Sequence, residues 1–151
     1  MNNDFLSDDR TDNTLLLPYS YDAEQTVIGA ALIEPASLSL ILEHINAEYF
    51  YDKKFGDVFL VILSLYASGT PADAVTVLAG CLKANIFPNE TAGREFIASL
   101  MRSVPSAKNV ESYCKIVAEK YYLRSLLYVC RDIQAEIAAG SGVDAEKILE
   151  F

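Results

Sequence analysis

The chain has 151 residues, of which 52% are hydrophobic and 22% are charged, a size and composition that fit one folded domain with a sizeable core. Its net charge of −9, from 21 acidic and 12 basic residues, argues against a surface that grips a nucleic-acid backbone, because such a grip needs clustered Lys and Arg. No apolar run is long enough to cross a bilayer and the N-terminus is unlike a secretory signal, so we expect a cytoplasmic protein without membrane contact.

The first 17 residues are predicted to form a disordered acidic tail. Residues 1–13 contain four aspartates and three asparagines and almost no hydrophobic side chains. The remaining residues, 18–151, are expected to fold as a helical head at 18–105, followed at 106–151 by a long helix and the truncated start of a helical hairpin.

A first helix is predicted from Asp22 to Glu34, in the stretch DAEQTVIGAALIE. Asp22 and Gln25 have the spacing of a capping box, and the apolar residues recur at the helical period, which indicates a short amphipathic helix. Gly29 lies inside this helix at a cost of about 1 kcal/mol relative to alanine. We therefore expect another backbone or a large ring to pack closely against Gly29.

Four further helices are predicted in the head, at residues 35–43, 53–67, 74–84 and 92–102. Pro35 suits the first turn of one of them, Gly69 ends the next and Asp73 caps the one after, since these residue types favour those positions. No stretch has the alternating pattern of a strand, so the predicted fold class is all-α. The side chains expected in the core are Tyr49, Phe50, Phe55, Phe59, Ile62, Leu63, Tyr66, Val77, Leu78, Cys81, Leu82, Phe96, Ile97, Leu100 and Met101.

Residues 106–140 predict one long helix, because the stretch has no proline and no glycine before Gly140 and Ser106 can cap its start. It would run for about 50 Å, which exceeds the width of the head. Its apolar residues change phase along the way. The residues expected to close the core of the head are Val110, Tyr113, Cys114, Val117 and Tyr121. A second stripe with heptad spacing consists of Ile116, Leu123, Leu126, Cys130, Ile133 and Ile137.

A heptad stripe needs a partner helix, so the second half of this helix is expected to project and to bury its stripe on another helix. Two other interpretations remain open, a single buried helix or two helices broken near residues 120–123. Asp144 can cap a further helix that has hardly begun at Phe151. We therefore expect the chain to be part of a longer protein, or its stripe to be covered by a second copy.

The sequence offers no candidate for catalytic, cofactor or metal chemistry. It has no phosphate-binding glycine loop, no GxSxG or HExxH motif and no Cys/His set with ligand spacing. Cys81, Cys114 and Cys130 are interpreted as small core residues in a reducing compartment, and His44 as a residue near the end of a short helix. The residues alone predict an acidic, all-helical interaction module without an active site.

Three stretches, PYSYDAEQTVIGAALIE at 18–34, AEYFYDKKFGDVFLVILSLYASGTPADAVTV at 47–77 and SVPSAKNVESYCKIVAEK at 103–120, closely resemble the N-terminal domain of bacterial DnaB-type replicative DNA helicases. The most specific pieces are Ala23, Glu24, Gln25 and Gly29, the pair Phe50 and Tyr51, the turn at 69–73, and Pro105, Ser106, Ala107 and Asn109. The resemblance implies a helical head followed by a hairpin. In that family hairpins pair, and three pairs form a collar on a hexameric motor ring.

The resemblance also implies partners and residue roles. The partners are the helicase-binding domain of primase and, in some bacteria, a helicase loader. The motor domain that uses ATP and Mg²⁺ is absent from these residues, so the parent protein, and not this chain, would be the enzyme. Hairpin and subunit contacts are assigned to the heptad stripe by its spacing. The positions that match the primase-facing surface of the family are Asp22, Phe96, Leu127 and Ile133.

Two of these assignments have plainer interpretations, since Phe96 suits a core position and Asp22 a helix cap. An alternative function is a free-standing helical adaptor or regulator that dimerises through the long helix. A small enzyme is the third and weakest interpretation.

Overall fold

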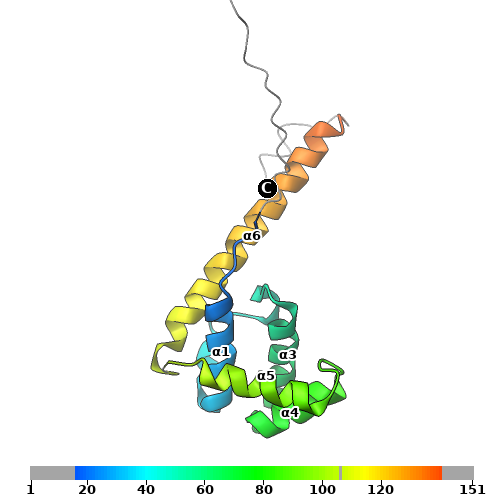
Figure 1. Ribbon diagram of the computed structural model, residues 1–151. Helices are drawn as coiled ribbons and strands as arrows, with labels where there is room; N and C mark the ends of the chain where they lie inside the picture. Colours follow the sequence, from blue (N-terminus) through cyan, green and yellow to red (C-terminus); the bar gives the residue numbers. More distant parts are fainter. Residues whose placement is uncertain (1–15, 106, 141–151) are drawn as a thin grey trace, which may run out of the picture.

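The computed structural model describes residues 16–105 and 107–140 (Figure 1). The predicted tail apart from residues 16 and 17, the Ser106 cap and the helix expected from Asp144 lie outside this part of the chain. Within it the fold is all-α, as predicted, and contains no strand. The α-helices are α1 (Tyr21–Ile33), α2 (Leu38–Leu42), α3 (Lys53–Ala67), α4 (Ala74–Lys83), α5 (Glu90–Arg102) and α6 (Val110–Ala138), and the 3-10 turns are η1 (Pro35–Ser37), η2 (Ala47–Tyr49) and η3 (Ala107–Asn109).

Helix α1 lies at the centre of the head and contacts α3, α5 and α6 (Figure 1). From Ala23 to Leu32 every residue except Gln25 is buried. The prediction of an amphipathic α1 is therefore wrong, because neighbours cover the helix on nearly all sides. The expected close approach at Gly29 is confirmed. A Cβ atom there would overlap the Leu100 carbonyl oxygen and lie 2.5 Å from Cγ2 of Val104.

The ends of the helices are set by capping side chains and glycines. Asp73 caps α4 as predicted, accepting hydrogen bonds from the Val75 and Thr76 amides at 3.0 and 2.9 Å. The capping box at Asp22 is wrong, because the side chain of Ser20 accepts from the Ala23 amide and places Asp22 inside the first turn. Gly69 ends α3 with φ of +71°, a conformation that favours glycine.

The core is made of aliphatic and aromatic side chains from all six helices, and most of the predicted core residues lie in it. Phe50, Phe55, Phe59, Ile62, Val77, Leu78, Cys81, Ile97 and Leu100 are buried, and Tyr49, Leu63, Leu82, Phe96 and Met101 are partly buried against them. Two predictions are wrong. Tyr66 is 52% exposed, because it lies on the outer side of α3, and Cys130 is exposed on α6, beyond the head.

Helix α6 begins at Val110, after η3, so its start differs from the one predicted at Ser106. It is continuous through residues 120–123, which excludes the interpretation as two broken helices. Its first half packs on the head through the buried Val110, Cys114 and Val117, and its second half projects away from the head (Figure 1). This arrangement is the predicted one, and it excludes a wholly buried helix.

Candidate protein-protein interface

The outer side of α6 is apolar, and it faces directly away from the side that packs on the head. Two of the apolar buried positions are followed nine residues later by a stripe position, and nine residues are about two and a half helical turns, which lead to the opposite side. Cys114 pairs in this way with Leu123, and Val117 with Leu126. The stripe therefore faces away from the described part of the head.

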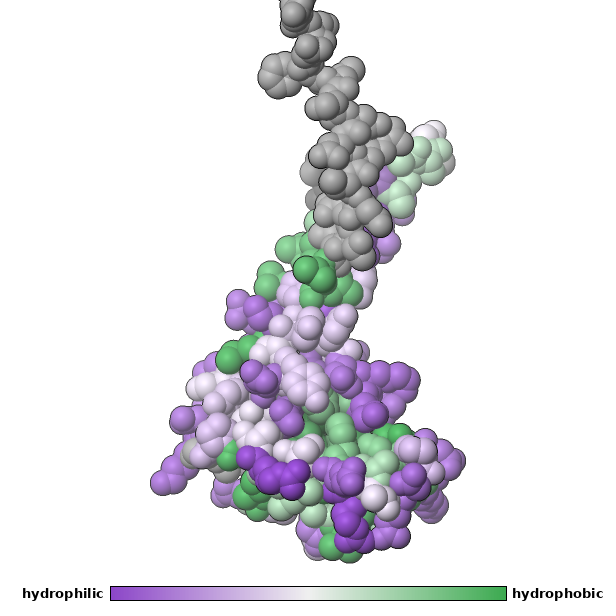
Figure 2. Space-filling model, viewed as in Figure 1, coloured by the Kyte–Doolittle hydropathy of each residue, from purple (hydrophilic) through white to green (hydrophobic). Residues whose placement is uncertain are grey.

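Most stripe residues are exposed although they are apolar. Leu126 and Ile137 are each 60% exposed, and Leu123 is 40% exposed. Ile116 and Cys130 are also exposed, whereas Leu127 and Ile133 are half-buried. Figure 2 shows hydrophobic residues gathered at the neck, where α6 rises from the head. Contiguous apolar surface of this kind marks a site of protein association. That the stripe contacts a subunit stays a prediction.

The four residues matched to the primase-facing surface are divided between the head and the projecting helix. Asp22 is exposed in the first turn of α1, and Leu127 and Ile133 lie on the projecting half of α6. Phe96 lies on α5. Its ring packs between those of Phe55 and Phe87, with centroid distances of 5.8 and 5.2 Å. These contacts support the interpretation of Phe96 as a residue at the edge of the core.

The junction between α6 and the head contains a buried charge that the sequence analysis misses. Arg124 is only 5% exposed. Its Nη1 donates to the carbonyl oxygen of Pro18 at 2.8 Å, and its Nη2 donates to the carbonyl oxygen of Tyr49 at 2.6 Å. The guanidinium also lies 5.4 Å from the centroid of the Tyr51 ring, in cation-π contact. A signal exists in the sequence, since Arg124 is a heptad beyond the buried Val117.

Glu24 is one of the residues that carry the family resemblance, and the structure shows a role that the sequence does not predict: it holds the loop that follows η2. Its carboxylate, 1% exposed, accepts hydrogen bonds from the amides of Tyr51 at 2.8 Å and Asp52 at 3.1 Å. Burial raises the pKa of Glu24, while these two hydrogen bonds and the positive charge of Arg124 act in the opposite direction. A carboxylate inside an otherwise buried helix is the sequence signal, because such a group needs donors from a neighbouring segment.

Tyrosine rings complete the junction. Tyr49 stacks on Tyr121 with a centroid distance of 4.2 Å, and Tyr19 stacks on Tyr51 at 4.6 Å. The hydroxyl groups of Tyr49 and Tyr122 lie 3.0 Å apart, and this hydrogen bond raises the pKa of Tyr49 to about 12. The start of α1, η2 and α6 therefore meet in one network of rings and hydrogen bonds.

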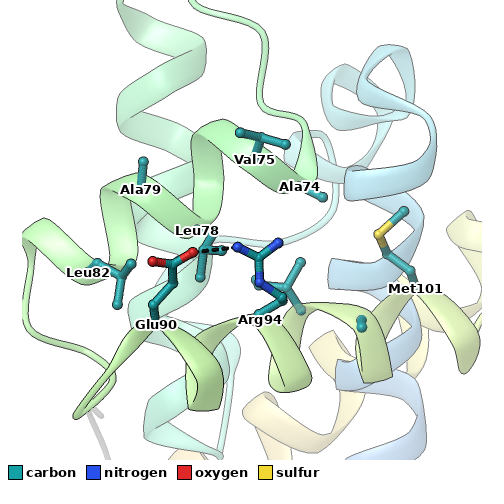
Figure 3. A pocket seen from close by; sticks show the side chains of 10 residues that line it. Ala74, Val75, Leu78, Ala79, Leu82, Glu90, Arg94 and Met101 are labelled. Atoms are coloured by element: carbon teal, nitrogen blue, oxygen red, sulfur yellow. Dashed lines mark hydrogen bonds and ion pairs between the residues drawn. The ribbon is translucent and has the colours of Figure 1, made fainter.

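An apolar groove of about 390 Å³ lies between α4 and α5 on the head (Figure 3). Leu78, Leu82 and Met101 line it, and Glu90 and Arg94 form an ion pair at its α5 side. Because the two charged groups bind each other, the groove offers hydrophobic contact rather than a set of reactive groups.

The described residues hold no group of three or more His, Cys, Asp or Glu side chains placed to bind a metal ion. Burial raises the pKa of Cys81 to about 11, and burial together with the charge of Glu111 raises the pKa of Cys114 to about 12. His44 follows α2, with its Nε2 3.8 Å from a carboxylate oxygen of Glu111. No helix in the described part of the chain has both the length and the hydrophobicity needed to span a membrane.

Residues 16–119 match the family model described as the DnaB-like helicase N terminal domain. The chain belongs to this family. It is 34% identical over 134 residues to the replicative DNA helicase DnaB of Mycobacterium leprae, a match that covers 88% of the chain and 22% of the helicase. It is 35% identical over 115 residues to the replicative DNA helicase DnaC of Bacillus subtilis, which covers 76% of the chain and 25% of that protein.

The fold of this DnaB-like domain is also similar to a solved structure. The crystal structure of the N-terminal domain of DnaB helicase from Mycobacterium tuberculosis superposes with a TM-score of 0.81 at 32% identity, covering 89% of this chain and 94% of that one. The family resemblance found in the sequence is thereby confirmed. The chain spans no more than a quarter of the two curated helicases, and it corresponds to their N-terminal part.

Proposed function

We propose that this DnaB-like domain is the assembly and docking module of a replicative DNA helicase, acting in DNA replication. The supporting observation is the stripe on the outer side of α6, which is apolar, exposed and turned away from the head. Burying one leucine side chain contributes about 1.5–3 kcal/mol, so a second helix laid along the stripe gains from each position that it covers.

In the whole helicase, domains of this kind pair through α6 and the pairs form a hexameric collar. ATP and Mg²⁺ bind in a separate motor domain. The collar receives the helicase-binding domain of primase and, in some bacteria, a loader. The negative net charge of the chain favours protein partners over direct contact with DNA. Each relative named above is a replicative helicase, which favours this function over a free-standing adaptor.

The experiment is sedimentation of the chain with a charge placed in the stripe. Leu126→Asp puts a carboxylate at the centre of the stripe, and we expect it to abolish or strongly weaken self-association. Ala135→Asp is the matched control, because Ala135 is exposed on the same helix nine residues away, on the opposite side. Equal self-association of the two variants would refute the assembly role.

Docking of primase is tested separately by binding of the isolated helicase-binding domain of a bacterial primase. Leu127 is the most informative of the four candidate positions, because it is half-buried on the projecting half of α6 and its replacement leaves the core of the head intact. Leu127→Asp should weaken binding, while Ala135→Asp should not. Phe96 is a poor probe, since its ring also packs on Phe55 and Phe87.

A further inference from the structure

Arg124 is the last residue of α6 with a buried side chain. Before it, the buried positions of the helix are Val110, Cys114 and Val117, all apolar. Beyond it, no side chain of the described helix is buried. Arg124 is therefore the last buried contact of α6 with the head before the described helix projects.

The guanidinium of Arg124 bridges two segments that are far apart in the sequence. Its two terminal nitrogens donate to the carbonyls of Pro18, ahead of α1, and Tyr49, in η2. A guanidinium suits this task because its donors lie in one rigid plane and reach two acceptors at once. A lysine ammonium at the same position carries its three donors on one nitrogen and lacks this planar fork.

One acceptor of Arg124, the loop at Tyr49, is itself held in place. The Tyr49 ring stacks on Tyr121 of α6, and the next residues of the loop, Tyr51 and Asp52, donate their amides to Glu24 of α1. Glu24 also attracts the charge of Arg124. The central helix of the head and the base of α6 are thus connected through one short loop.

We propose that Arg124 is a positioning residue that sets the angle at which α6 leaves the head, and thereby the direction in which the stripe meets a second helix. The part of this proposal that concerns the second helix rests on the proposed function. The part that concerns the angle does not, and it is tested on single molecules of the chain.

The test measures the distance between a spin label on the head and one on the projecting helix. Labels are attached at Ser64→Cys on α3 and Glu136→Cys on α6, two exposed positions, with Cys130→Ser removing the exposed native thiol. The measurement is made in a Leu126→Asp background, so that self-association does not contribute to the distances.

Arg124→Met keeps a long apolar stem and removes all donors. We expect the single narrow distance peak of the parent chain to be lost in this variant. Arg131→Met is the matched control, because Arg131 is exposed on the same helix beyond the head, and it should keep the parental peak. Arg124→Lys should give a distribution between that of Arg124→Met and that of the parent chain, since an ammonium lacks the rigid planar fork that holds both carbonyls.

A purely stabilising role for Arg124 would lower the unfolding midpoint and leave the distances of the folded chain unchanged. Parental distances in folded Arg124→Met would therefore overturn the proposal. If that variant does not fold, Arg124→Lys decides in its place, and a parental peak there overturns the proposal equally. The proposed function fails by a different result, namely undiminished self-association of Leu126→Asp with the native Arg124.

Discussion

Gly29 of α1 lies so close to the backbone carbonyl of Leu100 on α5 that no side chain fits between the two helices. A methyl group at Gly29 would have to displace the Leu100 backbone or the Val104 side chain. Moving the backbone of a packed helix lowers the stability of the fold. We expect Gly29→Ala to lower the free energy of unfolding by about 1–3 kcal/mol, and Gly29→Leu to lower it further, as measured by urea denaturation.

The matched control for Gly29 is Gly56, which also lies within a helix. A Cβ atom on Gly56 would be 3.4 Å from the Ala47 carbonyl oxygen, close to ordinary contact. Gly56→Ala should therefore be neutral or should stabilise the chain by up to about 1 kcal/mol, because alanine favours helix. Equal effects at the two glycines would contradict the close-approach argument.

The cap of α1 predicts different outcomes for two neighbouring polar residues. Ser20→Ala removes the side-chain acceptor of the Ala23 amide and should cost about 0.5–2 kcal/mol of unfolding free energy. Asp22→Asn keeps a polar side chain in the first turn. It should change the unfolding free energy by less than about 0.5 kcal/mol, because only the interaction of the charge with the helix dipole is lost. Thermal unfolding followed by circular dichroism measures both. A larger loss for Asp22→Asn would restore Asp22 as the cap.

Glu24 should make the stability of the chain depend on pH in a defined direction. Burial raises the pKa of this carboxyl in the folded chain above its ordinary value of 4.5, so the folded chain holds the proton more tightly than the unfolded chain does. The stability contributed by Glu24 is then largest below pH 4.5 and falls as the pH rises through the folded pKa. Glu24→Gln cannot titrate. We expect the unfolding free energy of the parent minus that of the variant to decrease over this range; a constant difference would contradict the pKa direction.

The three cysteines should react at very different rates with a maleimide. The thiolate is the reacting form, and burial raises the pKa of Cys81 to about 11 and that of Cys114 to about 12, so both are protonated and covered near neutral pH. Cys130 is exposed on the stripe. Mass spectrometry should find one fast-reacting thiol, which Cys130→Ser removes. Its labelling should slow at chain concentrations at which the stripe is paired, whereas two fast thiols would contradict the burial of the core cysteines.

Local signals in the sequence were sufficient for most of the fold. Asp73 and Gly69 act on the nearest few residues, so the end of α3 and the start of α4 follow from residue type alone. The two sides of α6 also follow from spacing, because the helical period places Val117 and Leu126 on opposite sides whatever the head contains.

The junction depends on contacts that no local pattern encodes. Arg124 binds carbonyl groups that are 106 and 75 residues away, and a backbone carbonyl carries no sequence identity by which it can be anticipated. The helical recurrence of its apolar residues predicts an amphipathic α1, yet Glu24 and Thr26 of this helix are also buried. The Glu24 carboxylate can be buried because the amides of Tyr51 and Asp52 donate hydrogen bonds to it, and these loop residues are distant in the sequence.

A tilt of α6 at Arg124 would be magnified along the projecting half of the helix. From Arg124 to Ala138 the helix extends about 21 Å, so a tilt of about 10° at Arg124 carries the far end sideways by about 4 Å. That displacement is about as large as the distance between two side chains in contact, and a seam of interlocking side chains tolerates a far smaller shift. A small change in the direction of α6 at Arg124 would therefore be enough to separate the side chains of such a seam.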